Sequence, residues 1–125
     1  MSLSNQLSVF VQTHIIRANT EPYIKNEMIV ETIKQSYEKL ALKDVRYYVY
    51  PDAKFYKTHP ELMQQYLEYL DSITQLEDLK DINISMVRDS RETMRNNWQK
   101  FILEDCKTPY MLFLEHDWGF NQNID

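Results

Sequence analysis

Glycine is almost absent from this chain of 125 residues, which contains only Gly119. Glycine-rich loops such as the Walker loop and the dinucleotide fingerprint need several glycines, because the backbone must approach a phosphate closely. No glycine precedes residue 119, so the sequence excludes both mechanisms. Any phosphate that this chain binds would therefore be held by a metal ion and by side chains.

Cysteine and basic residues are also scarce. The single cysteine, Cys106, cannot form an internal disulfide, which fits a reducing compartment. The 14 lysines and arginines against 19 aspartates and glutamates give a net charge of −5, which argues against an extended nucleic-acid-binding surface. No apolar run approaches the length of a membrane span, and no basic segment leads into an apolar one at the N-terminus. We therefore expect a cytoplasmic protein with no nucleic-acid partner and no membrane span.

The length and composition are those of one globular domain. Hydrophobic residues make up 43% and charged residues 26% of the chain, which are ordinary values. A chain of 125 residues can bury one sizeable core but not two. We therefore expect residues 1–125 to form a single domain.

Apolar patterning predicts four strands that alternate with helices. Runs rich in β-branched and aromatic residues predict the strands, over residues 8–16, 45–50, 82–87 and 110–114. Apolar side chains at helical spacing predict the helices, over residues 21–40, from 58 to about 70, a short one around 73–79, and one following 89. With right-handed crossovers, this order gives an α/β fold with a doubly wound, mainly parallel four-stranded sheet flanked by helices, as in Rossmann-like proteins.

Two of the predicted helices begin with residues that have capping-box form. Thr58 with Glu61 precedes the second long helix, and Asp89 with Glu92 precedes the last. We expect these pairs to satisfy the free amide groups at the two helix N-termini.

The last predicted strand leads directly into two carboxylates with one residue between them. Tyr110 to Leu114 form an apolar run, typical of a strand in a parallel sheet, and Glu115 and Asp117 follow. In open α/β sheets, ligands bind just beyond the carboxyl ends of strands. Mg²⁺ and Mn²⁺ commonly take one or two carboxylates together with substrate phosphates. The pattern therefore predicts a metal site, with a solvated loop as the ordinary alternative.

Two arginines near the start of the last predicted helix are candidates for binding an anion. Arg91 and Arg95 would lie one turn apart near the helix N-terminus, where the dipole and free amides favour anions. Guanidinium groups also suit phosphates. The alternative is that both arginines pair with surface carboxylates such as Asp89 and Glu92, and the sequence favours neither reading.

The segment from Asp89 to Trp98, followed by a helix and then by Pro109 to Asp117, resembles the family 2 glycosyltransferases and their relatives of the GT-A fold. In those enzymes an Arg-Asn-bearing helix precedes an apolar strand that ends in Asp-x-Asp. The resemblance covers the order of elements along the chain, and its most specific part is residues 89–118. It implies binding of a nucleoside-diphosphate sugar, with Mn²⁺ or Mg²⁺ bridging the carboxylates to the diphosphate.

The resemblance also implies roles for particular residues. Asp117 would ligate the metal, Glu115 would lie near the metal, its waters or the ribose, and Arg95 would lie close to the nucleotide. The ends of the first two strands would hold the base through Thr13, His14, Arg17 and Asp52. For Asp52, a turn after Pro51 is the favoured interpretation. Uridine is our first choice of base and guanosine the second, so a UDP-sugar is expected ahead of a GDP-sugar.

Two departures from the family pattern affect these expectations. The first carboxylate is Glu115 rather than aspartate, so it reaches one methylene further and can contact a metal through water. GT-A enzymes also continue into a half that binds the acceptor and supplies the catalytic base, whereas this sequence stops at Asp125, eight residues after Asp117. We therefore expect the N-terminal, donor-binding portion of such an enzyme, with no base located and the acceptor unknown.

Two other functions stay open. A non-catalytic binding or regulatory module would keep the fold and act through a protein partner, and an exposed sheet edge could pair with a second copy to form a homodimer. A sugar-phosphate nucleotidyltransferase would need a glycine-rich loop after the first strand, and Gln12 to Arg17 contain no glycine. A zinc site is disfavoured because the three histidines lack the spacing of convergent ligands.

Overall fold

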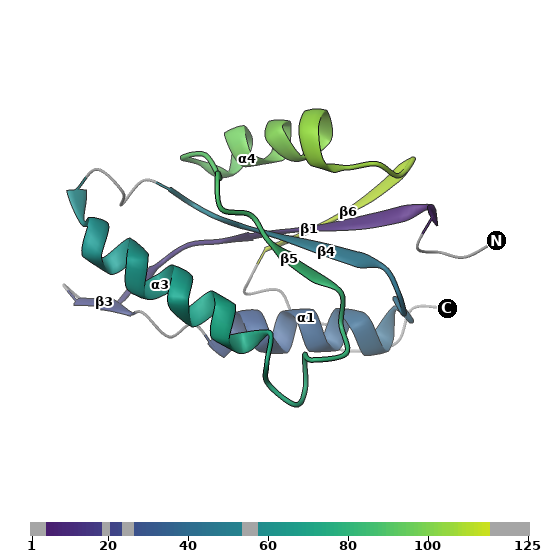
Figure 1. Cartoon of the computed structure of the whole chain (residues 1–125), viewed down its shortest axis with the longest axis horizontal. Coiled ribbons are helices and arrows are strands. Elements are labelled where there is room, and N and C mark those ends of the chain that lie inside the picture. Colours follow the sequence, from purple (N-terminus) through teal and green to yellow (C-terminus); the bar gives the residue numbers. More distant parts are fainter. Residues whose placement is uncertain (1–4, 19–20, 24–26, 54–57, 116–125) are drawn as a thin grey trace.

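Four parallel strands form the central sheet of the computed structural model, which describes residues 5–18, 21–23, 27–53 and 58–115. The strands are β1 (Leu7–Thr13), β4 (Arg46–Pro51), β5 (Ile84–Met86) and β6 (Tyr110–Glu115), and their order across the sheet is β5-β4-β1-β6. Helix α4 (Met94–Lys100) lies on one side of the sheet, and α1 (Glu27–Lys39) and α3 (Pro60–Ile73) lie on the other (Figure 1). The prediction of a doubly wound, Rossmann-like α/β fold is confirmed.

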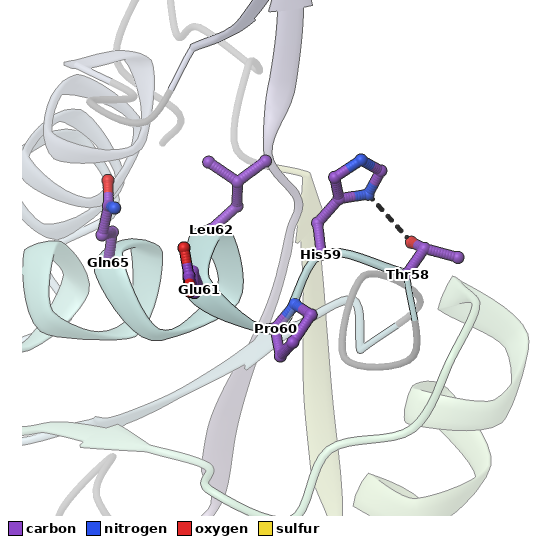
Figure 2. A pocket seen from close by; sticks show the side chains of 6 residues that line it. All are labelled: Thr58, His59, Pro60, Glu61, Leu62 and Gln65. Atoms are coloured by element: carbon purple, nitrogen blue, oxygen red, sulfur yellow. Dashed lines mark hydrogen bonds between the residues drawn. The ribbon is translucent and has the colours of Figure 1, made fainter.

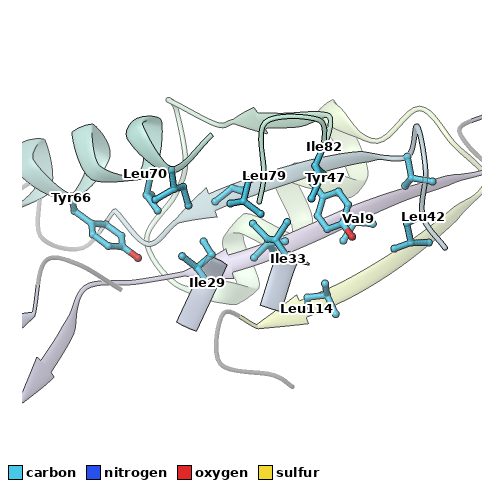
Figure 3. Close-up of a cluster of buried hydrophobic side chains, with 14 of the residues drawn as sticks. Val9, Ile29, Ile33, Leu42, Tyr47, Tyr66, Leu70, Leu79, Ile82 and Leu114 are labelled. Atoms are coloured by element: carbon cyan, nitrogen blue, oxygen red, sulfur yellow. The ribbon is translucent and has the colours of Figure 1, made fainter. Parts of the chain in front are cut away.

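The larger core lies between the sheet and helices α1 and α3 (Figure 3). Val9 and Val11 point to this side because successive side chains of a strand alternate between the two faces. Ile29 and Ile33 of α1 are fully buried against them, four residues apart as one helical face requires. Each such aliphatic side chain stabilises the fold by about 1.5–3 kcal/mol. The two strands and two helices are therefore joined mainly by apolar burial.

A smaller, aromatic core lies between the sheet and α4. Phe10, on the opposite face of β1 from Val9, is fully buried and its ring centroid lies 5.0 Å from Tyr50, 5.4 Å from Phe101 and 5.2 Å from both Trp98 and Phe113. Ring pairs at such distances add about 0.5–1.5 kcal/mol each beyond burial alone. Trp98 therefore packs against the sheet.

The chain after β1 differs from the prediction. The first strand ends at Thr13, and residues 16–23 contain an antiparallel pair of short strands, β2 (Ile16–Ala18) and β3 (Glu21–Tyr23). Helix α1 therefore begins at Glu27 rather than at residue 21. Thr20 and Pro22 resemble a helix start in sequence, but proline is also tolerated in an edge strand, where its missing N–H is not needed by a neighbour.

Both predicted capping boxes are wrong. Helix α3 has His59 at its N-cap with no side-chain cap bond, and Pro60 occupies the first turn, where its missing N–H costs nothing. Helix α4 begins at Met94, and the Oγ1 of Thr93 accepts a hydrogen bond from the Asn96 N–H at 3.3 Å. Several hydroxyl or carboxylate side chains near a helix start can compete for the N-cap position, and sequence alone does not rank them.

The remaining boundaries shift by a few residues. The short helix expected around residues 73–79 is a series of turns, with hydrogen bonds such as Leu79 N–H to Leu76 O at 3.0 Å. Strand β5 covers only Ile84–Met86, and α4 continues into a π-helical turn, η2 (Phe101–Asp105). Within the described ranges, no helix is long and apolar enough to cross a bilayer.

Candidate functional site

The order of the strands changes direction beside β1. The chain passes from β1 to β4 and β5 on one side, and then returns to place β6 on the other side of β1. In open α/β sheets, ligands bind outside the carboxyl ends of the strands at this reversal. The carboxyl ends of β1 and β6 are therefore the place in this fold where a ligand is expected.

Several of the candidate residues come together at the carboxyl ends of these strands. Glu115, the last residue of β6, is paired in register with Gln12 of β1, so it lies next to the strand end that carries Thr13 and His14. The Asp52 N–H donates a 2.8 Å hydrogen bond to the Thr13 carbonyl, which brings the end of β4 to the same place. The carboxyl end of the sheet therefore carries four of the candidate residues, namely Thr13, His14, Asp52 and Glu115.

Thr13 and His14 have different surroundings although they are adjacent. The Thr13 side chain is fully buried, and its hydroxyl is hydrogen-bonded to the phenol of Tyr66 in α3. His14 is exposed. Of the two side chains, only the imidazole of His14 is accessible to a ligand from solvent. Thr13 connects the end of β1 to helix α3.

Arg91 does not lie on a helix, contrary to the prediction. It precedes α4, its Nη1 donates to the Asp89 carbonyl at 2.7 Å, and its Nη2 lies 3.8 Å from a carboxylate oxygen of Glu104. The surface pairing considered for this arginine is therefore present, with Glu104 as the carboxylate. Because both side chains are about half exposed, this ion pair contributes little to stability.

Arg95 lies in the first turn of α4 and is exposed. It forms no hydrogen bond or ion pair with another residue of the described part of the chain. With Met94, Trp98 and Phe113 it lines an open hollow of about 450 Å³ between α4 and β6. Its guanidinium is therefore the cation of this region that is available to an anionic ligand.

Sequence reasoning missed a buried amide that organises this end of the sheet. Asn97 is fully buried, and its Nδ2 donates to the Oε1 of Gln12 at 3.2 Å while its Oδ1 accepts the Arg91 N–H at 2.6 Å. The Arg91 carbonyl in turn accepts the Ala53 N–H at 3.2 Å. Asn97 thus ties α4, the preceding loop and the ends of β1 and β4 together. Asn97 lies four residues before Phe101, on the apolar face of the helix, and this position was the sequence signal that the amide is buried.

A buried lysine holds the start of the π-helical turn. The Lys100 side chain is 4% exposed, and its Nζ lies 3.1 Å from Asp89 and 3.0 Å from Asp105, which also accepts a hydrogen bond from the Tyr50 hydroxyl. Burial opposes the charge, but hydrogen bonds to Asp105 and Asp89 outweigh it and raise the pKa of Lys100 above its usual value. Asp89 is therefore an ion-pair partner of Lys100 and not a helix cap.

A second hollow lies at the N-terminus of α3, at the same end of the sheet (Figure 2). It has a volume of about 290 Å³ and is lined by Thr58, His59, Pro60, Glu61, Leu62 and Gln65. A 3.0 Å hydrogen bond joins the His59 ring to the Thr58 hydroxyl. The hollow contains one carboxylate and one imidazole, and we assign no ligand to it.

The second predicted metal ligand, Asp117, lies outside the described residues, as does the side chain of Arg17 on β2. Among the residues that are described, no group of three histidines, cysteines, aspartates or glutamates is placed to hold a metal. Mg²⁺ and Mn²⁺ need no such group where one or two carboxylates and the phosphates of a substrate supply the oxygens. Glu115 places one carboxylate at the carboxyl end of the sheet, beside Gln12.

No protein-family model, curated protein or solved structure matches this chain. Its function is accordingly inferred from the positions and the chemistry of its own residues.

Proposed function

We propose that this chain binds a nucleoside-diphosphate sugar together with Mn²⁺ or Mg²⁺, as a metal-dependent glycosyltransferase or the donor-binding part of one. The observation that carries the proposal is the position of Glu115, which lies beside Gln12 where the strand order reverses. A UDP-sugar is the preferred donor and a GDP-sugar the second, and the acceptor is unassigned. The free thiol of Cys106 supports a reducing, cytoplasmic location.

The proposal gives each residue at this edge a task. Glu115 and Asp117 hold the metal, which when bound would neutralise the negative charge that develops on the leaving diphosphate. Arg95 is exposed and, among the described residues, unpaired, so its guanidinium can bind a phosphate without first giving up another partner. His14 and Asp52 lie at the ends of β1 and β4, where the base would be held.

Arg91 has a smaller task in this proposal. It must leave Glu104 and the Asp89 carbonyl before it can bind a phosphate, although the Glu104 pair is weak at 3.8 Å in solvent. We therefore assign the main phosphate contact to Arg95 and treat Arg91 as an accessory residue.

Thermal denaturation with ligands tests the proposal directly. UDP, GDP, UDP-glucose and GDP-mannose would each be added with and without Mn²⁺, because a ligand that binds only the folded state raises the melting temperature. We expect a saturable rise that requires both metal and nucleotide, larger for the uridine compounds. If the chain melts cooperatively and no combination raises the melting temperature, the proposal is wrong.

Carboxylate variants then locate the site. Glu115→Gln and Asp117→Ala are expected to remove the metal-dependent rise, because each loses a negatively charged oxygen donor. Glu38→Gln is the matched control, since Glu38 is an exposed glutamate on α1. A rise that survives in Asp117→Ala, or that disappears equally in Glu38→Gln, would contradict the assignment of the metal ligands.

A protein-binding module is the second candidate function, and one observation favours it. Large apolar side chains are exposed along α4, η2 and β6, namely Met94, Ile102, Leu103, Tyr110 and Met111. Single exposed apolar residues are normal, but a row of them along neighbouring elements is typical of an interaction surface. Association that is independent of metal and nucleotide would support this function.

A further inference from the structure

The two edges of the central sheet are protected to different degrees. β5, at one edge, has only three residues and is followed closely by Arg88. β6, at the other edge, has six residues, and Tyr110 to Leu114 include neither a charged residue nor a proline. Natural sheets shield their edges with short strands, charges, prolines or a covering element. β5 follows this rule, whereas in β6 only the last residue, Glu115, is charged.

The backbone of β6 offers hydrogen-bonding groups beyond the sheet. The Tyr110 N–H donates to the Gln6 carbonyl at 2.9 Å, so the backbone of Tyr110 points toward β1. Because these directions alternate along a parallel strand, the amide and carbonyl groups of Met111 and Glu115 point away from β1. Among the described residues, no strand pairs with β6 on that outer side.

Apolar side chains flank this open edge on the α4 side of the sheet. Met111 is 38% exposed, and Met94 of α4 and Ile102 of η2 are 42% and 39% exposed. Met94 also lines the hollow of about 450 Å³ beside Phe113. We call the outer edge of β6 together with Met94, Ile102 and Met111 the β6 surface.

We infer that the β6 surface pairs with the β6 surface of a second copy of this chain. The two β6 strands would run antiparallel about a twofold axis beside Phe113, with Met111 of each copy opposite Glu115 of the other. In this register the outward backbone groups of Met111 in one copy pair with those of Glu115 in the other. The unpaired N–H and C=O groups of both copies are then hydrogen-bonded. Twofold pairing of identical surfaces is the commonest way in which a protein forms a closed dimer.

The same arrangement covers the apolar side chains. A twofold axis perpendicular to the sheet keeps both α4 helices on one face, with the two paired β6 strands below them. The hollow beside Phe113 in one copy then adjoins the hollow of the other, so Met94 of both copies can fill the joined space. Burial of these side chains supplies the main driving force for association.

Charge complementarity identifies a second copy as the occupant. Two residues of opposite charge lie at the β6 surface, Arg95 beside the hollow and Glu115 at the end of β6, and neither forms an ion pair within the described part of the chain. The two α4–η2 segments would run antiparallel, so Arg95 of one copy faces the carboxyl end of the partner's segment, where free carbonyls favour a cation. The surface is thus nearly neutral on a chain of net charge −5, and two copies repel each other least there.

Sedimentation velocity of the full chain over a range of concentrations tests the inference, without nucleotide or metal. We expect twice the mass of one chain at high concentration. Met111→Lys is expected to give the monomer, because a charge on an edge strand opposes pairing. Leu76→Lys is the matched control, since Leu76 is 45% exposed in the turns that precede the opposite edge, and we expect this variant to dimerise like the parent.

A second variant keeps the test decisive if Met111→Lys fails to fold. Tyr110→Lys changes a side chain that is already 65% exposed, and it is also expected to reduce dimerisation at least tenfold. A mass of one chain at hundreds of micromolar, a mass above two chains, or unchanged dimerisation in the folded lysine variants would overturn the inference. Because no ligand is present, none of these outcomes depends on the proposed nucleotide site.

Discussion

Asn97 and Gln12 are 85 positions apart in the chain, yet the Nδ2 of Asn97 donates a 3.2 Å hydrogen bond to the Oε1 of Gln12 beneath α4. Asn97 is fully buried and Gln12 is 6% exposed. The other end of the Asn97 amide accepts the Arg91 N–H at 2.6 Å. One side chain therefore sets the position of the loop before α4 relative to β1, and with it the position of Arg95.

Replacing this amide is expected to destabilise the fold. Asn97→Ala leaves the Gln12 amide and the Arg91 N–H without this partner in a buried place, which we expect to lower the free energy of unfolding by about 2–4 kcal/mol. Asn96→Ala is the control, because Asn96 is exposed and its change should stay within about 0.5 kcal/mol. Urea denaturation measures both, and equal effects would contradict the role given to Asn97.

Most of the sheet could be predicted from sequence because β1, β4 and β6 each contain an apolar run bounded by polar or turn residues. Val9 to Val11 are buried, and in β4 Tyr47, Val49 and Tyr50 are buried and Tyr48 is partly buried, which is the pattern of central strands in a parallel sheet. The position of Glu115 at a strand end followed from the same reasoning. The pairing of strands 7–13 and 110–115 was not predicted, because right-handed crossovers restrict the possible topologies but do not fix the order of the strands.

The local details could not be predicted, because they depend on contacts between distant parts of the chain. Asp89 has the form of a helix cap, but it pairs with Lys100 eleven residues later. The π-helical turn is held by Asp105, which accepts a hydrogen bond from Tyr50 of β4. A pattern of neighbouring residues does not identify such distant partners, so the sequence predicts the wrong cap at Asp89 and does not predict the π-helical turn.

Stability is expected to fall in alkaline solution because buried groups hold their protons. Burial, only partly opposed by the hydrogen bond with Ser36, raises the pKa of Tyr47 to about 12, whereas an unfolded tyrosine titrates near pH 10. Between these values the unfolded chain binds fewer protons than the folded one, so the free energy of unfolding decreases as the pH rises. Burial and Asp105 raise the pKa of Tyr50, and Lys100 shifts in the same direction.

Denaturation at several pH values measures this decrease. We expect Tyr47→Phe to be less stable than the parent at pH 8, because it loses the 2.5 Å bond to Ser36, but to lose less stability above about pH 10. Tyr110→Phe is the control, since that ring is 65% exposed, and its pH profile should follow the parent. If the stability of Tyr47→Phe decreased with pH in parallel with that of the parent, another group would cause the loss of stability in alkaline solution.

Thr93 caps α4 in a backbone conformation that suits glycine. Its φ is 70° and its ψ 149°, a region that a β-branched residue enters only at a cost of about 1–3 kcal/mol. Thr93→Gly removes this cost and gives up only a few tenths of a kcal/mol of capping, so we expect it to raise stability by about 1 kcal/mol. Thr93→Ala keeps the strain and loses the cap, so it should destabilise the protein. Thermal denaturation of both variants distinguishes these outcomes, and destabilisation by glycine would contradict the strain.

The two arginines provide a sharp comparison for the proposed nucleotide site. Arg95 is exposed and unpaired within the described residues, whereas Arg91 already contacts Glu104 and the Asp89 carbonyl. Because a charge-assisted hydrogen bond to phosphate is worth about 1.5–3 kcal/mol, we expect Arg95→Ala to weaken UDP binding in the presence of Mn²⁺ at least tenfold. Arg91→Ala should weaken it less, since part of its interaction with phosphate is offset by the contacts that it must break.

Titration calorimetry of UDP with Mn²⁺ measures both affinities, and Arg46→Ala supplies the control for removing a positive charge. Arg46 begins β4, so it lies at the opposite end of the strand from Asp52, and its Nη1 contacts Ser85 at 3.3 Å. Screening over such a distance should leave its effect below twofold at physiological salt. If Arg91→Ala weakened binding more than Arg95→Ala, the phosphates would lie over the loop before α4 rather than over its first turn. If all three variants had the same effect, long-range charge alone would explain the binding, because no single guanidinium would then contact the phosphates.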